Sequence, residues 1–244
     1  MGLLWSSHSR EIGRTGLTIS DFVDAAISLA REEGIGALSI RNVASRLGVR
    51  AMAMYSAVPG KSDLVALMVD KAYRDLYAEG DEPDTTDWRK GLREIASANR
   101  ALYARHEWLH ALTPVRSAMG PYEARKHEIE LRVIDRIGLT DFEMDQALTL
   151  VVTHVAQACR MESQLRRERM DTGLDDDEWW VQAMPVLERV YDPERFPLCV
   201  RVGTAASAAR NGQFWGQEIF EFGLERIIDG IGALISNRGA MENP

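Results

Sequence analysis

The 244-residue sequence has only two cysteines, no long apolar run and no catalytic motif. The two cysteines, Cys159 and Cys199, are too few for a disulfide framework and suit a reducing compartment. We expect both to be buried as small apolar side chains. No window approaches the ~20 apolar residues that a membrane-spanning helix needs, and the N-terminal stretch lacks the pattern of a secretory signal. These absences predict a cytoplasmic protein with no membrane partner.

Side chains that would catalyse a reaction or bind a metal are also scarce. The chain has no H-E-x-x-H, no G-x-S-x-G and no phosphate-binding glycine loop. Its histidines are scattered, and the nearest approach to a ligand set is His127-Glu128-x-Glu130. On a helix only residues three or four apart converge, so this run is a poor metal site. The sequence therefore predicts neither an enzyme nor a bound cofactor or metal.

Apolar residues recur at helical spacing along most of the chain, and no segment alternates convincingly as a strand. The valine-rich run 198–202 comes nearest to a strand, but it is isolated. We therefore predict an all-α protein with an N-terminal three-helix domain and a larger C-terminal helical domain. The predicted boundaries are a flexible arm over 1–17, a helix-turn-helix domain over 18–64 whose linking helix continues to about 78, and a C-terminal domain over 85–238. Helices of that C-terminal domain are expected at 88–105, 106–112, 121–136, 141–169, after 175 and at 214–236.

The stretch 37–64 carries the clearest local pattern. Ser39 is a good N-cap, and the apolar residues that follow it share one face of a short helix. Gly48 can adopt the left-handed conformation that a tight turn needs, and Pro59-Gly60 ends a second short segment. Two short helices around a glycine turn are the helix-turn-helix arrangement, whose second helix lies in the DNA major groove. Plain core hairpins can look the same by pattern alone.

Charge is distributed unevenly along the chain. The net charge of −8 argues against nucleic-acid binding over the whole surface. Residues 1–63, however, carry seven Lys and Arg against six Asp and Glu, and no acid lies between Glu33 and Asp63. Arg41, Arg46 and Arg50 fall within that gap. Because phosphate binding requires a basic contact face rather than a basic protein, this distribution is compatible with DNA binding.

The motif itself resembles a known family. The run Ser39-x-Arg41-x-Val43-Ala44-x-x-Leu47-Gly48-Val49, followed by Tyr55, Lys61 and Leu64, resembles the N-terminal domain of the tetracycline-repressor (TetR) family of bacterial regulators. A shorter run, Phe222-Gly223-Leu224-x4-Asp229-Gly230, resembles the last helix of the subgroup with the tetracycline-repressor type of ligand domain. The resemblance implies two partners, a double-stranded operator DNA and a small-molecule effector.

The resemblance implies roles for particular residues of the N-terminal helix-turn-helix domain, which we call the head. Arg41 would reach a base edge or a phosphate, and Tyr55 and Lys61 would contact phosphates. Met52 is expected to face the groove and Met54 to fill the core. The predicted DNA-binding residues are Thr18, Ser39, Arg41, Arg50, Ala51, Met52, Tyr55, Ser56 and Lys61.

For the C-terminal domain the resemblance implies ligand binding and a homodimer built by the last two long helices. The predicted dimer-interface residues are Ala158, Leu165, Gly223, Ile227, Gly230, Ile231 and Leu234. The candidate ligand-binding residues are Trp108, Met119, Met144, His154, Met161 and Trp180, although residues of these types are more often simply part of the core.

The predicted function is that of a ligand-responsive repressor that a small hydrophobic molecule releases from a palindromic operator. Two alternatives stay open at this point. A ligand-independent DNA-binding regulator would differ by lacking a closed apolar cavity in its C-terminal domain. A helical enzyme or binding module that has lost DNA binding would explain why the second short helix carries so few polar residues.

Overall fold

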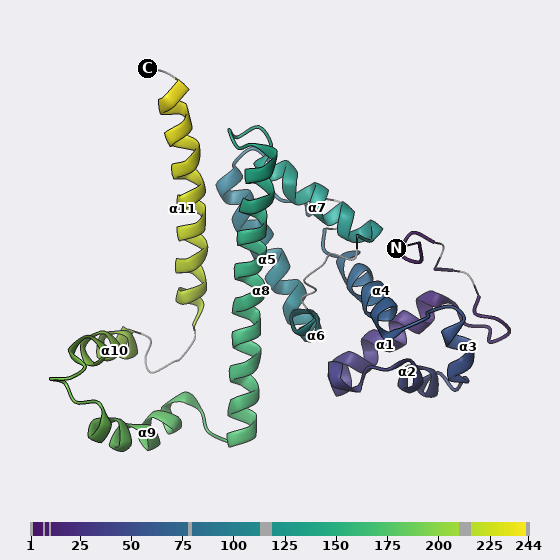
Figure 1. Ribbon diagram of the computed structural model, residues 1–244, viewed down its shortest axis with the longest axis horizontal. Helices are drawn as coiled ribbons and strands as arrows, with labels where there is room; N and C mark the ends of the chain where they lie inside the picture. Colours follow the sequence, from purple (N-terminus) through teal and green to yellow (C-terminus); the bar gives the residue numbers. More distant parts are fainter. Residues whose placement is uncertain are drawn as a thin grey trace.

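The computed structural model describes residues 2–6, 8–9, 11–77, 80–112, 119–209 and 216–242. Within these ranges the regular structure is entirely helical, which confirms the predicted all-α fold (Figure 1). None of the helices in these ranges is long and apolar enough to cross a membrane.

The head contains α1 (Ile19–Glu33), a short 3-10 turn (Ile35–Ala37), α2 (Ile40–Arg46) and α3 (Ala51–Tyr55). Ser39 caps α2 by accepting a hydrogen bond from the Asn42 backbone N–H at 3.0 Å, as its position in the sequence predicted. Gly48 has a φ of 69°, a left-handed conformation that suits glycine and turns the chain between α2 and α3. Phe22 and Met54 are fully buried in the core that these helices share.

The helix α4 (Lys61–Tyr73) joins the head to the C-terminal domain. It ends before the predicted limit of about 78, because the chain turns after Tyr73 so that Tyr77 is buried and its hydroxyl donates to Glu130 at 2.8 Å. Residue 78 itself lies outside the described ranges. On its head side, α4 pairs Lys71 with Asp24 of α1 at 2.7 Å.

On its other side, α4 places the buried Asp70 against the start of α7. Asp70 Oδ1 accepts hydrogen bonds from the backbone N–H groups of Tyr122 at 3.0 Å and Glu123 at 2.9 Å. A carboxylate suits these first-turn amides, which have no partner within their own helix. Gly120 is required beside it, because a Cβ at that position would lie 2.2 Å from Asp70 Oδ1. Head and C-terminal domain are therefore joined by a buried polar contact.

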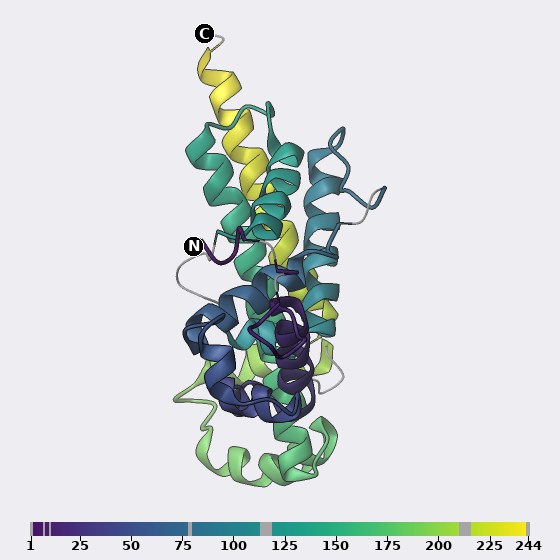
Figure 2. The ribbon, with the colours of Figure 1, turned by 90° about the vertical axis from the view of Figure 1, so that its right-hand side faces the viewer.

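The C-terminal domain is built on α5 (Trp88–Arg105), α6 (Glu107–Ala111), α7 (Pro121–Ile134), α8 (Asp141–Thr172) and α11 (Gln217–Glu242). In Figures 1 and 2 the head lies beside the lower half of the molecule, with α7 and α11 mostly above it, whereas α8 runs past the head to the lower end. A capping box of Thr140 and Glu143 starts α8, and Gly173 with φ of 70° ends it. The long α8 packs against α5, α6, α7 and α11, so it is the central element of this domain.

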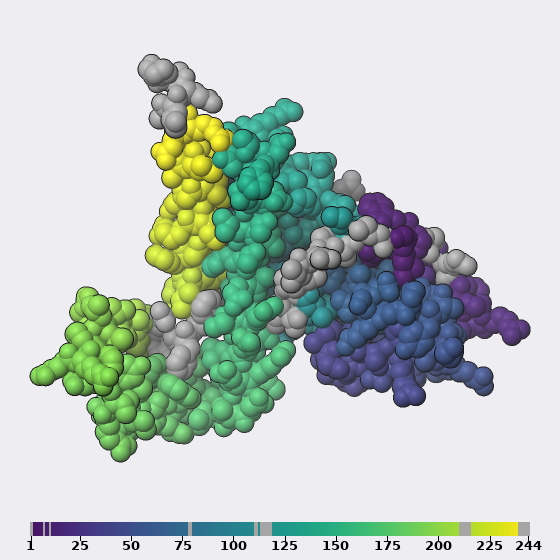
Figure 3. Space-filling view, in the orientation of Figure 1, coloured from purple at the N-terminus to yellow at the C-terminus, as the bar shows by residue number. Residues whose placement is uncertain are grey.

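Two further helices, α9 (Asp176–Val190) and α10 (Pro197–Ala209), project from the lower end of α8, away from the head (Figures 1 and 3). The sequence did not predict α10, because its apolar, β-branched run 198–202 looked like an isolated strand. The expectation that both cysteines are buried is wrong for one of them: Cys159 is buried in α8, whereas Cys199 is exposed on α10. The reason is that α10 has no buried residue.

The segment before α1 also differs from the flexible arm that was expected over 1–17. Ile12 and Leu4 are buried in the hydrophobic core, at 2% and 5% exposure. The Ile12 backbone N–H donates to the Leu17 carbonyl at 2.7 Å, and Glu11 forms an antiparallel bridge with Thr18. Further back, the Trp5 indole N–H donates to the Met119 carbonyl at 2.8 Å. These apolar anchors hold the described part of the segment against both the head and the C-terminal domain.

Candidate nucleic-acid interface

The surface of α3 is apolar at its centre. Met52 is 79% exposed and points away from the protein, whereas Met54 is fully buried, so the two methionines divide as predicted between surface and core. Tyr55, 46% exposed, and Ser56 complete the exposed side of this short helix. Ala51 is partly buried and packs against the core of the head.

Three cations lie on the elements that precede and follow this apolar centre in the chain. Arg41 lies in the first turn of α2, Arg50 is the N-cap of α3, and Lys61 is the first residue of α4. All three are exposed, and none forms an ion pair with a carboxylate among the residues that the structure describes. Their charges are therefore available to phosphate groups, whose neutralisation supplies most of the sequence-independent affinity for DNA.

Arg46 does not belong to this set, although the sequence places it in the same acid-free gap. Its guanidinium lies 2.6 Å from a carboxylate oxygen of Glu32 and 3.9 Å from one of Glu33, both at the end of α1. The hydrogen bond to Glu32 raises the pKa of Arg46 above its usual value. The segment between Glu33 and Asp63 therefore contains no acidic residue, but acidic side chains of α1 lie close to it in the folded protein.

Several predicted contact residues already use their side chains within the head. The Thr18 hydroxyl donates to Asp21 at 2.7 Å, Ser39 caps α2, and the Ser56 hydroxyl donates to the Ala53 carbonyl at 2.7 Å. Asn42, which the sequence did not single out, donates its side-chain amide to the Ala37 carbonyl at 2.7 Å. These hydrogen bonds stabilise α2, α3 and the segments next to them. The side chains that make them are therefore already hydrogen-bonded within the head.

The candidate ligand residues do not converge on one cavity. Trp108 and Met144 are buried in the core, at 3% and 9% exposure, whereas Met119 is 59% exposed. The His154 ring stacks on Phe220 of α11 and lies 2.9 Å from its carbonyl oxygen, so it joins two helices. Met161 lies on α8, and Trp180 lies on α9.

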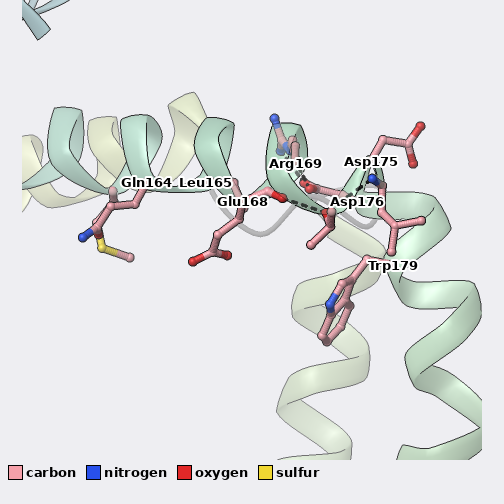
Figure 4. A pocket seen from close by; sticks show the side chains of 10 residues that line it. Gln164, Leu165, Glu168, Arg169, Asp175, Asp176 and Trp179 are labelled. Atoms are coloured by element: carbon pink, nitrogen blue, oxygen red, sulfur yellow. Dashed lines mark hydrogen bonds and ion pairs between the residues drawn. The ribbon is translucent and has the colours of Figure 1, made fainter. Parts of the chain in front are cut away.

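A pocket of 500 Å³ lies in the corner between α8 and α9 and is open to solvent on one side (Figure 4). Met161, Leu165 and Trp179 contribute its apolar surface, and Arg169 forms an ion pair with Asp176 at 2.6 Å across the corner. Of the predicted ligand residues, only Met161 lines it. The sequence predicts the capped break between the two helices. It does not indicate which of the neighbouring tryptophans faces the corner.

A second pocket of 310 Å³ lies where α5 meets the middle of α8. It is lined by Tyr103 of α5 and, on α8, by Val152, Thr153, Ala156, Gln157 and Arg160. Burial raises the pKa of the Tyr103 phenol to about 12, so this hydroxyl stays protonated and can donate a hydrogen bond at neutral pH. The predictions from sequence included none of these residues, because no local pattern marks them.

The predicted dimer residues separate into two groups. Ala158 and Ile231 are buried inside the chain, and Gly223 of α11 lies against the His154 ring of α8, so these three positions are already packed within one subunit. Leu234 is 43% exposed, and nothing lies within 4 Å of a Cβ built at Gly230. The remaining predicted positions, Leu165 and Ile227, are partly buried.

Comparison with known proteins agrees with this geometry. Residues 22–68 match the family described as bacterial regulatory proteins, tetR family, and residues 80–235 match the tetracyclin repressor-like C-terminal domain. The chain is 34% identical over 246 aligned residues to the HTH-type transcriptional repressor DrrR1 of Streptomyces coeruleorubidus, covering 99% of this chain and 88% of that one. It is 28% identical to the HTH-type transcriptional repressor Rv1353c of Mycobacterium tuberculosis, covering 91% and 83%.

Solved structures show the same fold. Apo ActR from Streptomyces coelicolor aligns with a TM-score of 0.73 at 22% identity, covering 91% of this chain and 98% of that chain. ActR in complex with actinorhodin aligns with a TM-score of 0.72 at 24% identity, covering 89% and 96%. At this level of identity the likeness concerns the fold alone.

Proposed function

The chain belongs to the tetR family of bacterial regulatory proteins, and we propose that it is a homodimeric repressor released from a palindromic operator by a small hydrophobic effector. Its family makes it a DNA-binding regulator rather than an enzyme. The observation that carries the proposal is the head surface, where the exposed Arg41, Arg50 and Lys61, on the elements before and after α3, have no carboxylate partners among the described residues. A related chain, DrrR1, is itself a transcriptional repressor.

Dimerisation is supported by the outer faces of α8 and α11. On α8, Leu150 and Met161 are 56% and 38% exposed, and on α11 Phe222 and Leu234 are 65% and 43% exposed. The two helices pack side by side, so their exposed apolar residues can form one surface for a second copy. A single five-residue recognition helix makes few contacts, and two-fold symmetric half-sites are the usual solution.

Effector response requires a link between the C-terminal domain and the head, and α4 is suited to be that link. Its Asp70 holds the first turn of α7, and its Lys71 holds α1. A molecule that shifts α7 therefore changes the position of α4 and of the head. By linkage, an effector that weakens operator binding is itself bound more weakly by the operator complex. ActR, which shares the fold, has been solved in complex with actinorhodin, which supports a small-molecule effector for this chain.

The proposal is tested by selecting operator sequences from random DNA with the purified full-length protein. We expect one palindromic sequence to be enriched, and Lys61→Ala to weaken binding to all sequences alike. A panel of apolar aromatic compounds is then titrated while tryptophan fluorescence and operator affinity are both measured. Coupling of the typical ~1–3 kcal/mol would weaken the operator complex roughly 5- to 150-fold. Absence of any enriched sequence would refute DNA-binding regulation, and a bound compound without effect on operator affinity would favour ligand-independent control.

A further inference from the structure

We propose that Met52 recognises the C5-methyl group of one thymine in each operator half-site. This inference rests on the proposed operator binding, and it goes further by assigning both the class of base and the side chain that selects it. The selected base would then be distinguished through an apolar contact at the centre of α3, rather than through a hydrogen bond.

The geometry of α3 places Met52 where a base contact is made. The N-terminal residues of a recognition helix reach the base edges in the major groove, and Met52 is the second residue of α3. Its side chain is 79% exposed, so almost none of it is used in packing within the head. By contrast, Ala51 and Ala53 on the same helix are partly buried against the core and are too short to extend beyond Met52.

Three polar side chains of α2 and of the end of α3 are engaged within the head. The Ser56 hydroxyl donates to the Ala53 carbonyl, the Asn42 amide donates to the Ala37 carbonyl, and the Arg46 guanidinium is paired with Glu32.

The cations Arg41 and Arg50 stand at the first turn of α2 and at the N-cap of α3, so neither lies in the exposed middle of α3 itself. That middle offers an unbranched thioether, which donates no hydrogen bond and accepts one only weakly.

The chemistry of the major groove then selects the base. Guanine, cytosine and adenine present only hydrogen-bond donors and acceptors there, whereas thymine also presents a methyl group. An exposed methionine gains free energy from covering that methyl group and loses it by covering an unsatisfied polar edge. Removing one buried methyl group changes affinity roughly fourfold, and two symmetric half-sites multiply this to about 15-fold.

The test uses the operator selected by the full-length protein. Each thymine is replaced in turn by deoxyuridine, which lacks only the methyl group, and the dissociation constant is measured by fluorescence anisotropy at fixed salt. We expect one thymine in each half-site whose replacement weakens wild-type binding roughly fourfold, and about 15-fold when both are replaced. Met52→Ala should bind the unmodified operator about 15-fold more weakly and should no longer distinguish thymine from deoxyuridine. Since Met52 is so exposed, thermal unfolding should show that the variant folds like the wild type.

Two matched controls sharpen the result. Tyr55→Phe alters the neighbouring exposed side chain of α3, and it should weaken both operators equally while the deoxyuridine effect remains. Replacing the selected thymine pair by 5-methylcytosine·guanine or by cytosine·guanine compares a methyl group with none on the same hydrogen-bonding pattern. The wild type should prefer the methylated pair roughly fourfold per half-site, and Met52→Ala should show no preference.

The inference is overturned if no thymine replacement weakens wild-type binding, or if Met52→Ala remains as sensitive to deoxyuridine as the wild type. It is equally overturned if the wild type fails to prefer the methylated cytosine pair. Failure of the underlying function looks different, because the initial selection would then enrich no sequence at all.

Discussion

Gly230 and Gly223 lie on the same helix, α11, but the structure predicts opposite consequences for substituting them. A Cβ at Gly223 would lie 2.4 Å from His154 Cε1, so this glycine serves the packing of α8 against α11 within one chain. A Cβ at Gly230 would meet nothing within 4 Å. If α8 and α11 form the dimer surface, Gly230 is where a second copy approaches closely. Gly230→Leu should therefore break the dimer and spare the fold, and Gly223→Ala should weaken the fold.

The magnitudes follow from the surroundings of each glycine. At Gly230, leucine removes the helix penalty of glycine, which favours the monomer fold by up to ~1 kcal/mol. Overpacking of a formed interface costs ~1–3 kcal/mol, and two-fold symmetry doubles it, so the dimer dissociation constant should rise about 30-fold to 10⁴-fold. At Gly223, the His154 ring must leave its stack on Phe220 and its hydrogen bond to the Phe220 carbonyl. The net loss of stability there should be ~1–3 kcal/mol, since improved helix propensity offsets part of it.

The assay is a dilution series of each variant by light scattering, combined with urea unfolding followed by circular dichroism. Gly230→Leu should give a folded monomer at concentrations where the wild type is dimeric, and Gly223→Ala should shift the unfolding midpoint downward. A Gly230→Leu protein that stays dimeric and binds operator normally would place the interface elsewhere. Unfolding of Gly230→Leu even at high concentration would contradict the open surroundings of Gly230.

Three further predictions concern charged groups. Lys126→Met should destabilise the fold by ~3–5 kcal/mol in urea unfolding, because it leaves the buried carboxylate of Glu130 without the ammonium 2.7 Å away. Arg41→Ala should flatten the logarithmic salt dependence of operator affinity by about 2 for the dimer, whereas Arg46→Ala should change it little, because Arg46 is already paired in the head. Hydrogen bonds from Arg238 and Thr140 lower the pKa of Glu143 to about 2. The ionised Glu143 carboxylate should therefore stabilise the fold fully at pH values above its ordinary pKa of 4.5, and this stabilisation should disappear as the pH falls through about 2. Glu143→Gln should accordingly lower the melting temperature more at pH 6 than at pH 2.5.

Each of these has a distinct contrary result. The double variant Lys126→Met with Glu130→Gln should regain part of the lost stability, and no recovery would mean that charge is not the cause. Equal salt slopes for the Arg41 and Arg46 variants would remove the distinction between a free and a paired arginine. A constant difference in melting temperature across pH would show that Glu143 does not titrate as its contacts imply.

The head could be predicted from sequence because its signals are local. Ser39 caps the helix that begins at the next residue, Gly48 turns the chain, and Pro59-Gly60 precedes the start of α4, each through interactions within a few residues. Similar local reasoning was available for α10, whose first residue is Pro197, a favoured first position in a helix. The β-branched residues that follow it favour a strand instead, so the local signals conflict and do not identify this helix.

Contacts distant in sequence could not be predicted in this way. The buried cluster in which Glu130 accepts hydrogen bonds from Tyr77 at 2.8 Å and from Asn99 at 2.8 Å joins three separate parts of the chain. No periodicity identifies such partners, because each residue taken alone fits an ordinary helix. The same limit explains why the candidate ligand residues proved scattered: they were chosen for their side-chain chemistry, and only packing decides which side chains share a cavity.

Arg46 shows how this limit affects the interpretation of DNA binding. With Arg46 paired to Glu32, the charges assigned to phosphate contact are those of Arg41, Arg50 and Lys61, three in each head. Six phosphate contacts in a dimer correspond to a logarithmic salt slope of about −5, a moderate electrostatic contribution. The net charge of −8 on each chain further opposes sequence-independent binding. A regulator with this charge distribution must draw a larger share of its operator affinity from contacts to the bases, and α3 presents an apolar side chain at the place where such contacts are made.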